Sequence, residues 1–427
     1  MIPAQLPGRR SGNRLPEGVR PEMPARACLP RGSRRRTLLA AAFGAAFLSV
    51  TACGPTPAPE IATSEVTATI DVGALPGAPV VLPDGSAVYV TNAEDGTVSV
   101  IDTATNEVRA TIDVGRGPGG PAVLPDGSAL YFTHAWGETV AVIDTATNEV
   151  RATIDLGPAP RSAVMLPDGS ALYVTHSVQG PEGATDVISV IDTATNEVTA
   201  TIDVGFGPSL AMLPDGSALY VPVYGDRAVS VIDTATNEVT ASVPVGDAPD
   251  LAVVAPDSSA VYVVSVEAGA LAVIDTATNA VTATIDVGHA AYGPAVLPDS
   301  SAVYVPHSVI DAAEGASPED MTAADVVSVI DTATNQVTAT IEIASGLGLT
   351  ALAAVPDSSA VYAANTNDGT VSVISTATNE VADTLDVGSG STDDSVPAAL
   401  FAAVLPDSSA VYVTNPWDGT VTVIERS

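Results

Sequence analysis

Three of the four histidines stand at the same position of a short motif that recurs along the chain. His134, His176 and His307 each end a four-residue run that begins with tyrosine, where other copies end in asparagine, as at Asn92. Imidazole is the commonest side-chain ligand for transition metals, so these three histidines form a candidate metal site. No two histidines have His-x-His or His-x-x-x-His spacing, so only the geometry of the fold would bring them together.

Bulky aromatic and basic side chains also interrupt the repeated pattern. Residues present in every copy are explained by folding, so residues that break the pattern are the candidates for function. Aromatic and arginine side chains on the loops of a rigid scaffold are typical binding anchors. The predicted ligand or partner face consists of His134, Trp136, Arg161, His176, Tyr224, His289, Tyr292, His307 and Trp417. Ordinary loop variation explains the same departures without any ligand, and this alternative stays open here.

The elements that position these residues come from an internal repeat, and variants of the stretch Leu82–Gly115 recur to the C-terminus. Each copy contains four short runs of alternating β-forming residues, separated by turn signals such as Pro83-Asp-Gly-Ser86 and Asp102-Thr-Ala-Thr-Asn106. Four short strands per repeat of roughly 42 residues predict the blade of a β-propeller. The Pro-Asp step occurs eight times, with its proline at Pro83, Pro125, Pro167, Pro214, Pro256, Pro298, Pro356 and Pro406.

The ends of the repeat region predict how the ring closes. Val66–Val72 resembles the fourth strand of a blade, but no first three strands precede it. The chain ends on a third strand, Val421–Ile424, with no fourth strand after it. We expect Val66–Val72 to complete the last blade, which leaves no open edge. The predicted fold class is therefore all-β, an eight-bladed propeller of four-stranded blades, with seven blades as the alternative.

Two copies of the motif spell a known repeat. Tyr89-Val-Thr-Asn92 and Tyr412-Val-Thr-Asn415 match the YVTN-type β-propeller repeat family, and the chain resembles that family from Val66 to Ser427. The resemblance implies a secreted or surface-anchored propeller that acts in binding or scaffolding. Some relatives are classed as lactonases, so a metal-binding or lactonase-like enzyme that uses the histidines is the alternative. Catalysis is less expected, because the predicted innermost strands contain no histidine or carboxylate for general acid–base chemistry.

The first 53 residues have the organisation of an export signal. Arg34-Arg-Arg36 precedes an apolar run, Leu38–Val50, that is too short to span a membrane. Val50-Thr-Ala-Cys53 resembles a bacterial lipobox, which implies that Cys53 is lipidated; an ordinary secretory signal with a chance cysteine is the alternative. The arginine cluster resembles a twin-arginine export signal. Residues 54–65 then form a tether rich in proline and alanine, and residues 66–427 form the propeller.

Acidic residues greatly outnumber basic ones after Cys53. Six arginines and 48 acidic residues (all 50 except Glu17 and Glu22) follow it, a formal charge of about −42, and the chain has no lysine. Such a surface repels nucleic acid and anionic lipid headgroups. We therefore expect an exported, lipid-anchored monomer of the cell envelope that touches the membrane only through its anchor. Its expected partner is an envelope protein, a polysaccharide or a small ligand, and no cofactor is predicted apart from the transition metal.

Overall fold

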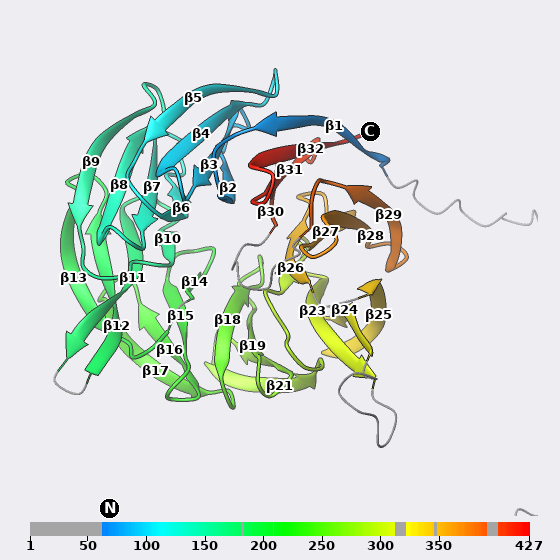
Figure 1. Ribbon diagram of the computed structural model, residues 1–427. Helices are drawn as coiled ribbons and strands as arrows, with labels where there is room; N and C mark the ends of the chain where they lie inside the picture. Colours follow the sequence, from blue (N-terminus) through cyan, green and yellow to red (C-terminus); the bar gives the residue numbers. More distant parts are fainter. Residues whose placement is uncertain (1–61, 181–182, 208, 312–321, 346–347, 391–399) are drawn as a thin grey trace, which may run out of the picture. The chain divides into compact units, whose positions relative to one another are not determined.

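The described residues form β-strands only. The computed structural model describes residues 62–180, 183–207, 209–311, 322–345, 348–390 and 400–427. Within these ranges the chain forms 32 strands in eight four-stranded antiparallel sheets. The sheets surround a central axis as blades, each with its first strand innermost (Figure 1). The predicted eight-bladed β-propeller is therefore confirmed. No helix among these residues is long and apolar enough to cross a membrane.

Seven blades each take four consecutive strands from one stretch of chain. The strands of blades 1 to 4 are β2 (Pro76–Val81), β3 (Ala87–Asn92), β4 (Thr97–Asp102), β5 (Glu107–Asp113), β6 (Pro118–Val123), β7 (Ala129–His134), β8 (Thr139–Asp144), β9 (Glu149–Asp155), β10 (Ala163–Met165), β11 (Ala171–Gly180), β12 (Gly183–Asp192), β13 (Glu197–Asp203), β14 (Ala211–Met212), β15 (Ala218–Val223), β16 (Ala228–Asp233) and β17 (Glu238–Pro244). The strands of blades 5 to 7 are β18 (Pro249–Val254), β19 (Ala260–Ser265), β20 (Ala270–Asp275), β21 (Ala280–Asp286), β22 (Ala295–Val296), β23 (Ala302–Asp311), β24 (Thr322–Asp331), β25 (Gln336–Ser345), β26 (Leu349–Ala354), β27 (Ala360–Asn365), β28 (Thr370–Ser375) and β29 (Glu380–Asp386).

Blade 8 joins the two ends of the repeat region. Its strands are β30 (Phe401–Val404), β31 (Ala410–Asn415), β32 (Thr420–Arg426) and β1 (Ser64–Asp71). β1 pairs antiparallel with β32 over its whole length, and Thr63 and Ser427 exchange two backbone hydrogen bonds of 3.0 Å. The N-terminal strand therefore closes the ring, as predicted from the missing fourth strand.

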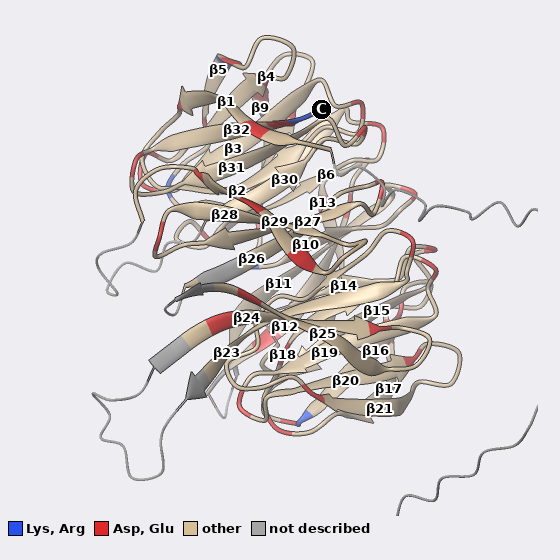
Figure 2. Ribbon diagram, turned by 90° about the vertical axis from the view of Figure 1, so that its right-hand side faces the viewer, with Lys and Arg blue, Asp and Glu red and all other residues tan. Residues whose placement is uncertain are grey.

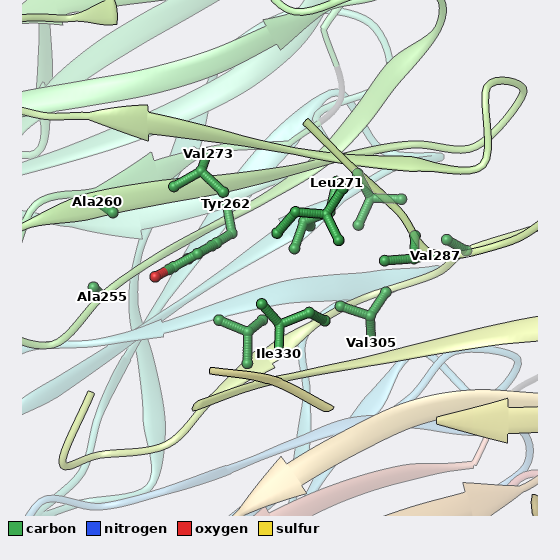
Figure 3. Close-up of a cluster of buried hydrophobic side chains, with 12 residues drawn as sticks. Ala255, Ala260, Tyr262, Leu271, Val273, Val287, Val305 and Ile330 are labelled. Atoms are coloured by element: carbon green, nitrogen blue, oxygen red, sulfur yellow. The ribbon is translucent and has the colours of Figure 1, made fainter. Parts of the chain in front are cut away.

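Apolar side chains fill the space between neighbouring blades. Every blade contributes a buried tyrosine from its second strand, and valine and isoleucine from the third strand pack beside it. Figure 3 shows one such cluster, in which Tyr262 and Val273 of blade 5 face Val305 and Ile330 of blade 6. The core is thus a ring of eight interfaces between blades. Shape-matched apolar sheets hold the blades together because their burial removes apolar surface from water.

The buried tyrosines also connect blades by hydrogen bonds. The Tyr173 hydroxyl of blade 3 donates to Asn237 Oδ1 of blade 4 at 2.7 Å, and five other tyrosines make the same bond to a neighbouring blade. The asparagine adopts a left-handed backbone, with φ of 57° at Asn237, which asparagine tolerates better than most residues. Burial raises the pKa of Tyr173 to about 12. The recurrent tyrosine and asparagine are therefore structural, as expected from their presence in the repeat.

One face of the propeller, which we call the turn face, holds the connections between first and second strands and between third and fourth strands. In blade 2 these are residues 124–128 and 145–148. Asp126 Oδ1 accepts the Ser128 backbone N–H at 2.9 Å, and the Thr145 hydroxyl donates to the Gly127 carbonyl at 2.6 Å. The two connections thereby support each other, and equivalent bonds recur around the ring.

The left-handed position of the Pro-Asp turn differs between the two halves of the ring. Blades 1 to 4 place glycine there, as predicted, with φ of 72° at Gly85. Blades 5 to 8 place serine there, with φ of 60° at Ser300. Ser300 Oγ accepts the Asp257 backbone N–H of the preceding blade at 3.1 Å, and Ser358 and Ser408 repeat this contact. The added hydrogen bond offsets the unfavourable backbone conformation of serine.

The opposite face, which we call the loop face, holds the connections between second and third strands and those between blades. In blade 2 these are residues 135–138 and 156–162. The sequence predicts long loops at 177–186 and 308–325, but much of this chain extends the strand pairs instead. β11 and β12 stay paired to Gly180 and Gly183, and β23 and β24 stay paired to Asp311 and Thr322. Alternating β-forming residues on both sides of each insertion favour this extension.

Candidate functional site

His176 and His307 are buried within their own blades. Their side chains are 4% and 6% exposed, and their Nε2 atoms lie 2.9 Å from Ser189 Oγ and Ser328 Oγ. Burial lowers the pKa of both imidazoles, so both are neutral at pH 7. Their Nδ1 atoms are also buried, and neither has a hydrogen-bond partner among the described residues.

The histidines replace asparagine in a structural contact. In blade 1, Asn92 Nδ2 donates to Ser99 Oγ at 2.9 Å, and Ser99 occupies the same register position as Ser189. Blade 2 has Ala141 at that position, and His134 instead places Nδ1 3.1 Å from Thr139 Oγ1. The imidazole therefore takes the place of the asparagine amide in a hydrogen bond to a hydroxyl of the third strand.

The metal prediction depends on whether these side chains converge. His134, His176 and His307 lie in blades 2, 3 and 6, and each contacts a hydroxyl of its own blade. Over the described ranges, no group of three or more His, Cys, Asp or Glu side chains is placed to hold a metal ion. The transition-metal site stays a prediction, and elemental analysis of the purified protein would test it.

Arg161 belongs to a buried charge network at the base of the loop face. Its Nη2 lies 2.5 Å from Asp186 Oδ1 and 2.9 Å from Ser177 Oγ, and Ser177 also donates to the same carboxylate oxygen. Asp186 is 1% exposed, whereas Arg161 is one-third exposed. The pair is thus anchored in the blade, and the exposed part of the guanidinium faces outward next to Phe206, whose ring centroid is 5.5 Å away.

Blade 6 contains a matching arrangement without an arginine. The Ser308 hydroxyl donates to Asp325 Oδ1 at 3.0 Å, and Asp325 Oδ2 accepts the Gly348 backbone N–H of the next blade. His289 forms an isolated backbone bridge with Ser308, next to this contact. His289 is therefore positioned by its backbone and does not join the buried histidines.

The exposed aromatic side chains gather on the loop face. Trp136 is 64% exposed, and the Arg116 guanidinium lies 5.9 Å from its ring centroid. Tyr224 is 47% exposed and donates to Glu267 Oε1 at 2.8 Å. Tyr292, Phe206 and Phe401 are 46%, 53% and 37% exposed. Because the repeated tyrosines are all buried, these positions present the large exposed aromatic surfaces of the described propeller.

Trp417 takes part in a different arrangement at the closing blade. It is half-buried and packs against the cluster between blades 7 and 8. It also lines a cavity of about 500 Å³, together with Leu75, Asp71, Glu94 and Asp95. Trp417 therefore packs between blades 7 and 8 and borders the cavity at the junction of blades 8 and 1. It is the least exposed aromatic residue of the predicted face.

One inner strand departs from expectation. The sequence places Asp250 just before the innermost strand of blade 5, but β18 begins at Pro249 and includes it. Burial raises the pKa of the Asp250 carboxyl. No second titratable side chain is paired with it in the interactions described, so this residue alone does not form an acid–base pair.

Comparisons with known proteins support the fold. No protein-family model matches the chain, and no curated protein matches its sequence. The fold is similar to that of a solved chain of Kuenenia stuttgartiensis hydrazine synthase, with a TM-score of 0.56 and 20% sequence identity. The similarity covers 82% of this chain and 95% of that chain. At this identity the likeness concerns the propeller architecture alone.

Sequence reasoning missed the buried acids of the loop face. The sequence predicts long loops that include Ser177 and Asp186 in blade 3 and Ser308 and Asp325 in blade 6. The sequence does contain a pattern that marks these residues. Both insertions begin with His-Ser-Val and end with Asp-Val. The sequence also gives no expectation for Phe401, which stands in an inner strand where most other blades have a small residue and blade 5 has Leu251. Cys53 and the signal segment lie outside the described residues.

Proposed function

We propose that the protein is an envelope lipoprotein of the YVTN-repeat type that binds a partner through its loop face. The propeller supplies a rigid frame, and the departures from the repeat supply the recognition surface. The lipid on Cys53 and the 54–65 tether would hold this frame at the membrane surface, after export by the secretory or the twin-arginine route.

One observation carries the proposal. Trp136, Phe206, Tyr224 and Tyr292 are each about half exposed or more, and all lie in connections of the loop face. Leaving large aromatic groups in water costs solvation free energy, and contact with a partner recovers it. Variation of a loop without function has no reason to collect these residues on one face.

The chemistry of the face favours a protein as the partner. Tryptophan, tyrosine and arginine are the side chains most enriched where binding energy concentrates in protein interfaces. Arg116 beside Trp136 and Arg161 beside Phe206 provide two such pairs. A polysaccharide or a small ligand would use the same surface, so the nature of the captured species becomes the readout.

The test is site-specific photo-crosslinking of the full chain in its native envelope. A photoreactive residue replaces Trp136 on the loop face, and in a matched control it replaces Ala146, which is exposed on the turn face of the same blade. We expect protein adducts from position 136 only, and their loss when Tyr224 and Tyr292 are changed to Ala. Glycan adducts would assign a polysaccharide instead. Equal labelling from both positions, or none, would overturn the proposal.

A further inference from the structure

The central channel contains a cavity that the loop-face proposal does not use. Its volume is about 620 Å³, and the inner strands β14, β18, β22 and β26 form its wall. This is within the usual size range of small-molecule pockets, roughly 300 to 1,000 Å³. The cavity extends along these strands to the prolines of the turn face, Pro214, Pro256 and Pro298.

The described side chains that line this cavity are all apolar. They belong to alanine, valine, leucine, methionine and proline. Several of these side chains, such as Met212, Val253 and Ala295, are only half-buried. A protein with about 42 excess negative charges after Cys53 thus keeps an uncharged, partly exposed surface at its axis. A ligand with an apolar chain would cover it and remove apolar area from water.

Aspartates adjoin the turn-face end of the cavity lining in the chain. Asp215, Asp257 and Asp299 directly follow the lining prolines Pro214, Pro256 and Pro298 and are exposed. Hydrogen bonds from the backbone and side chain of Ser217 lower the pKa of Asp215, and those from Ser259 lower that of Asp257. None of the three aspartates forms an ion pair with another described residue. Their charge is therefore available to a ligand.

We propose that the channel binds a single-chain amphiphile with a cationic head group. The alkyl chain lies along the apolar wall, and the head group lies among the aspartates that follow the lining prolines. Charge complementarity selects the head group, because an anionic amphiphile of the same chain length would meet like charges at the mouth. The cavity runs from Leu210 and Pro294, in connections of the loop face, to the prolines of the turn face. The head group is proposed to lie at the turn-face end, away from the exposed aromatic residues.

The proposal predicts how affinity depends on the length of the alkyl chain and on the charge of the head group. Each added methylene should tighten binding about fourfold while the chain still fits, as expected from about 0.8 kcal/mol per buried methylene. A cationic head should bind at least tenfold more tightly than an anionic head on the same chain. Calorimetry with the full chain would use octyl- and decyltrimethylammonium, with decanoate and decyl maltoside as probes of charge, all below their micelle concentrations.

Two variants locate the site. The triple change Asp215→Asn, Asp257→Asn and Asp299→Asn should weaken decyltrimethylammonium binding at least fivefold and leave decyl maltoside binding unchanged. The matched control Asp192→Asn, Asp233→Asn and Asp275→Asn removes the same charge from the outer turns of the same face. It should change affinity less than twofold. Ala295→Trp, which fills the cavity, should abolish binding of every probe.

Each outcome either supports or overturns the proposed amphiphile site. Binding with the chain-length dependence, the head-group preference and the difference between the two triple variants supports the site. No binding, or equal weakening by both triple variants, would overturn it, because the second result means general attraction to an acidic protein. If Ala295→Trp does not fold, as its melting curve would show, the two triple variants still give the answer.

Discussion

The turn face and the loop face hold nearly equal numbers of the connections between strands, yet they differ in how strictly they repeat. On the turn face, aspartate accepts the same backbone N–H in blade after blade, as Asp126 and Asp215 do. On the loop face, the second-strand residue three positions after the buried tyrosine is Asn92, His176 or Val223 in different blades. Figure 2 shows that acidic residues occur widely over the propeller, whereas basic ones are few.

This difference shows how strongly the fold limits the residue types on each face. A turn-face residue must provide a particular hydrogen bond and often a left-handed backbone, so few residue types fit. The loop-face residue at the position of Asn92 only has to fit a buried space and bond a hydroxyl. Histidine and asparagine can both do this. The loop face is therefore free to carry recognition residues, while the turn face carries stability.

Loss of ring closure should disturb both faces at once and have the largest effect. Deleting Ser64–Asp71 removes Val66, Ala68 and Ile70 from two clusters between blades. Burial of such side chains is worth on the order of 5 kcal/mol in sum. We expect a melting temperature lower by roughly 10 °C or more, measured by calorimetry. Deleting residues 54–61 instead is the control, and equal melting curves for the two deletions would contradict the closure.

A turn-face substitution should lower stability without changing the loop face. Asn237→Ala places alanine at a φ of 57° and removes the bond from Tyr173. We expect a loss of about 2 kcal/mol in the free energy of unfolding, and about 1 kcal/mol for Tyr173→Phe, which removes the bond alone. Denaturant unfolding measures both. If the two variants were equally destabilised, the left-handed backbone at residue 237 would not contribute to the loss of stability in Asn237→Ala.

The buried histidine should make stability depend on pH where asparagine would not. The pKa of His176 is lowered in the folded state, so below about pH 6.5 the unfolded chain binds the proton first. The contribution of neutral His176 is therefore present above pH 6.5 and is lost as the pH falls through the folded-state pKa. We expect the melting temperature of the wild type to fall relative to His176→Asn between pH 7 and pH 5. Parallel curves would show that the imidazole is not buried as described.

An exposed loop-face aromatic should contribute least to stability. Trp136→Ala should change the free energy of unfolding by no more than about 0.5 kcal/mol, because the side chain is 64% exposed. Tyr131→Ala in the same blade, where the ring is fully buried, should cost about 3 to 5 kcal/mol. Similar losses for both would mean that Trp136 belongs to the core, and the distinction between the faces would fail there.

The fold was predictable because each copy of the repeat gives the same information. Eight Pro-Asp steps and an unpaired strand at Val66–Val72 determine blade number and closure without any long-range information. The site was less predictable, because a histidine in a loop motif has the same sequence pattern whether it binds a ligand or bonds a hydroxyl of its own blade. Its burial and its bond to a hydroxyl of the third strand depend on the register of the strand pair, as at Ser189. The inter-blade bond of Ser300 likewise depends on how neighbouring turns approach.

The pairing of β1 with β32 has a mechanical consequence. Thr63 and Ser427 lie side by side at one end of this antiparallel pair, and Asp71 and Thr420 lie at the other. Tension applied between Thr63 and Ser427 therefore loads the pair from its end and breaks its hydrogen bonds one after another, rather than shearing them together. Under load, blade 8 would unzip first, while each of the other seven blades keeps four strands from one continuous segment. The pairing of β1 with β32 is thus the mechanically weakest contact of the propeller.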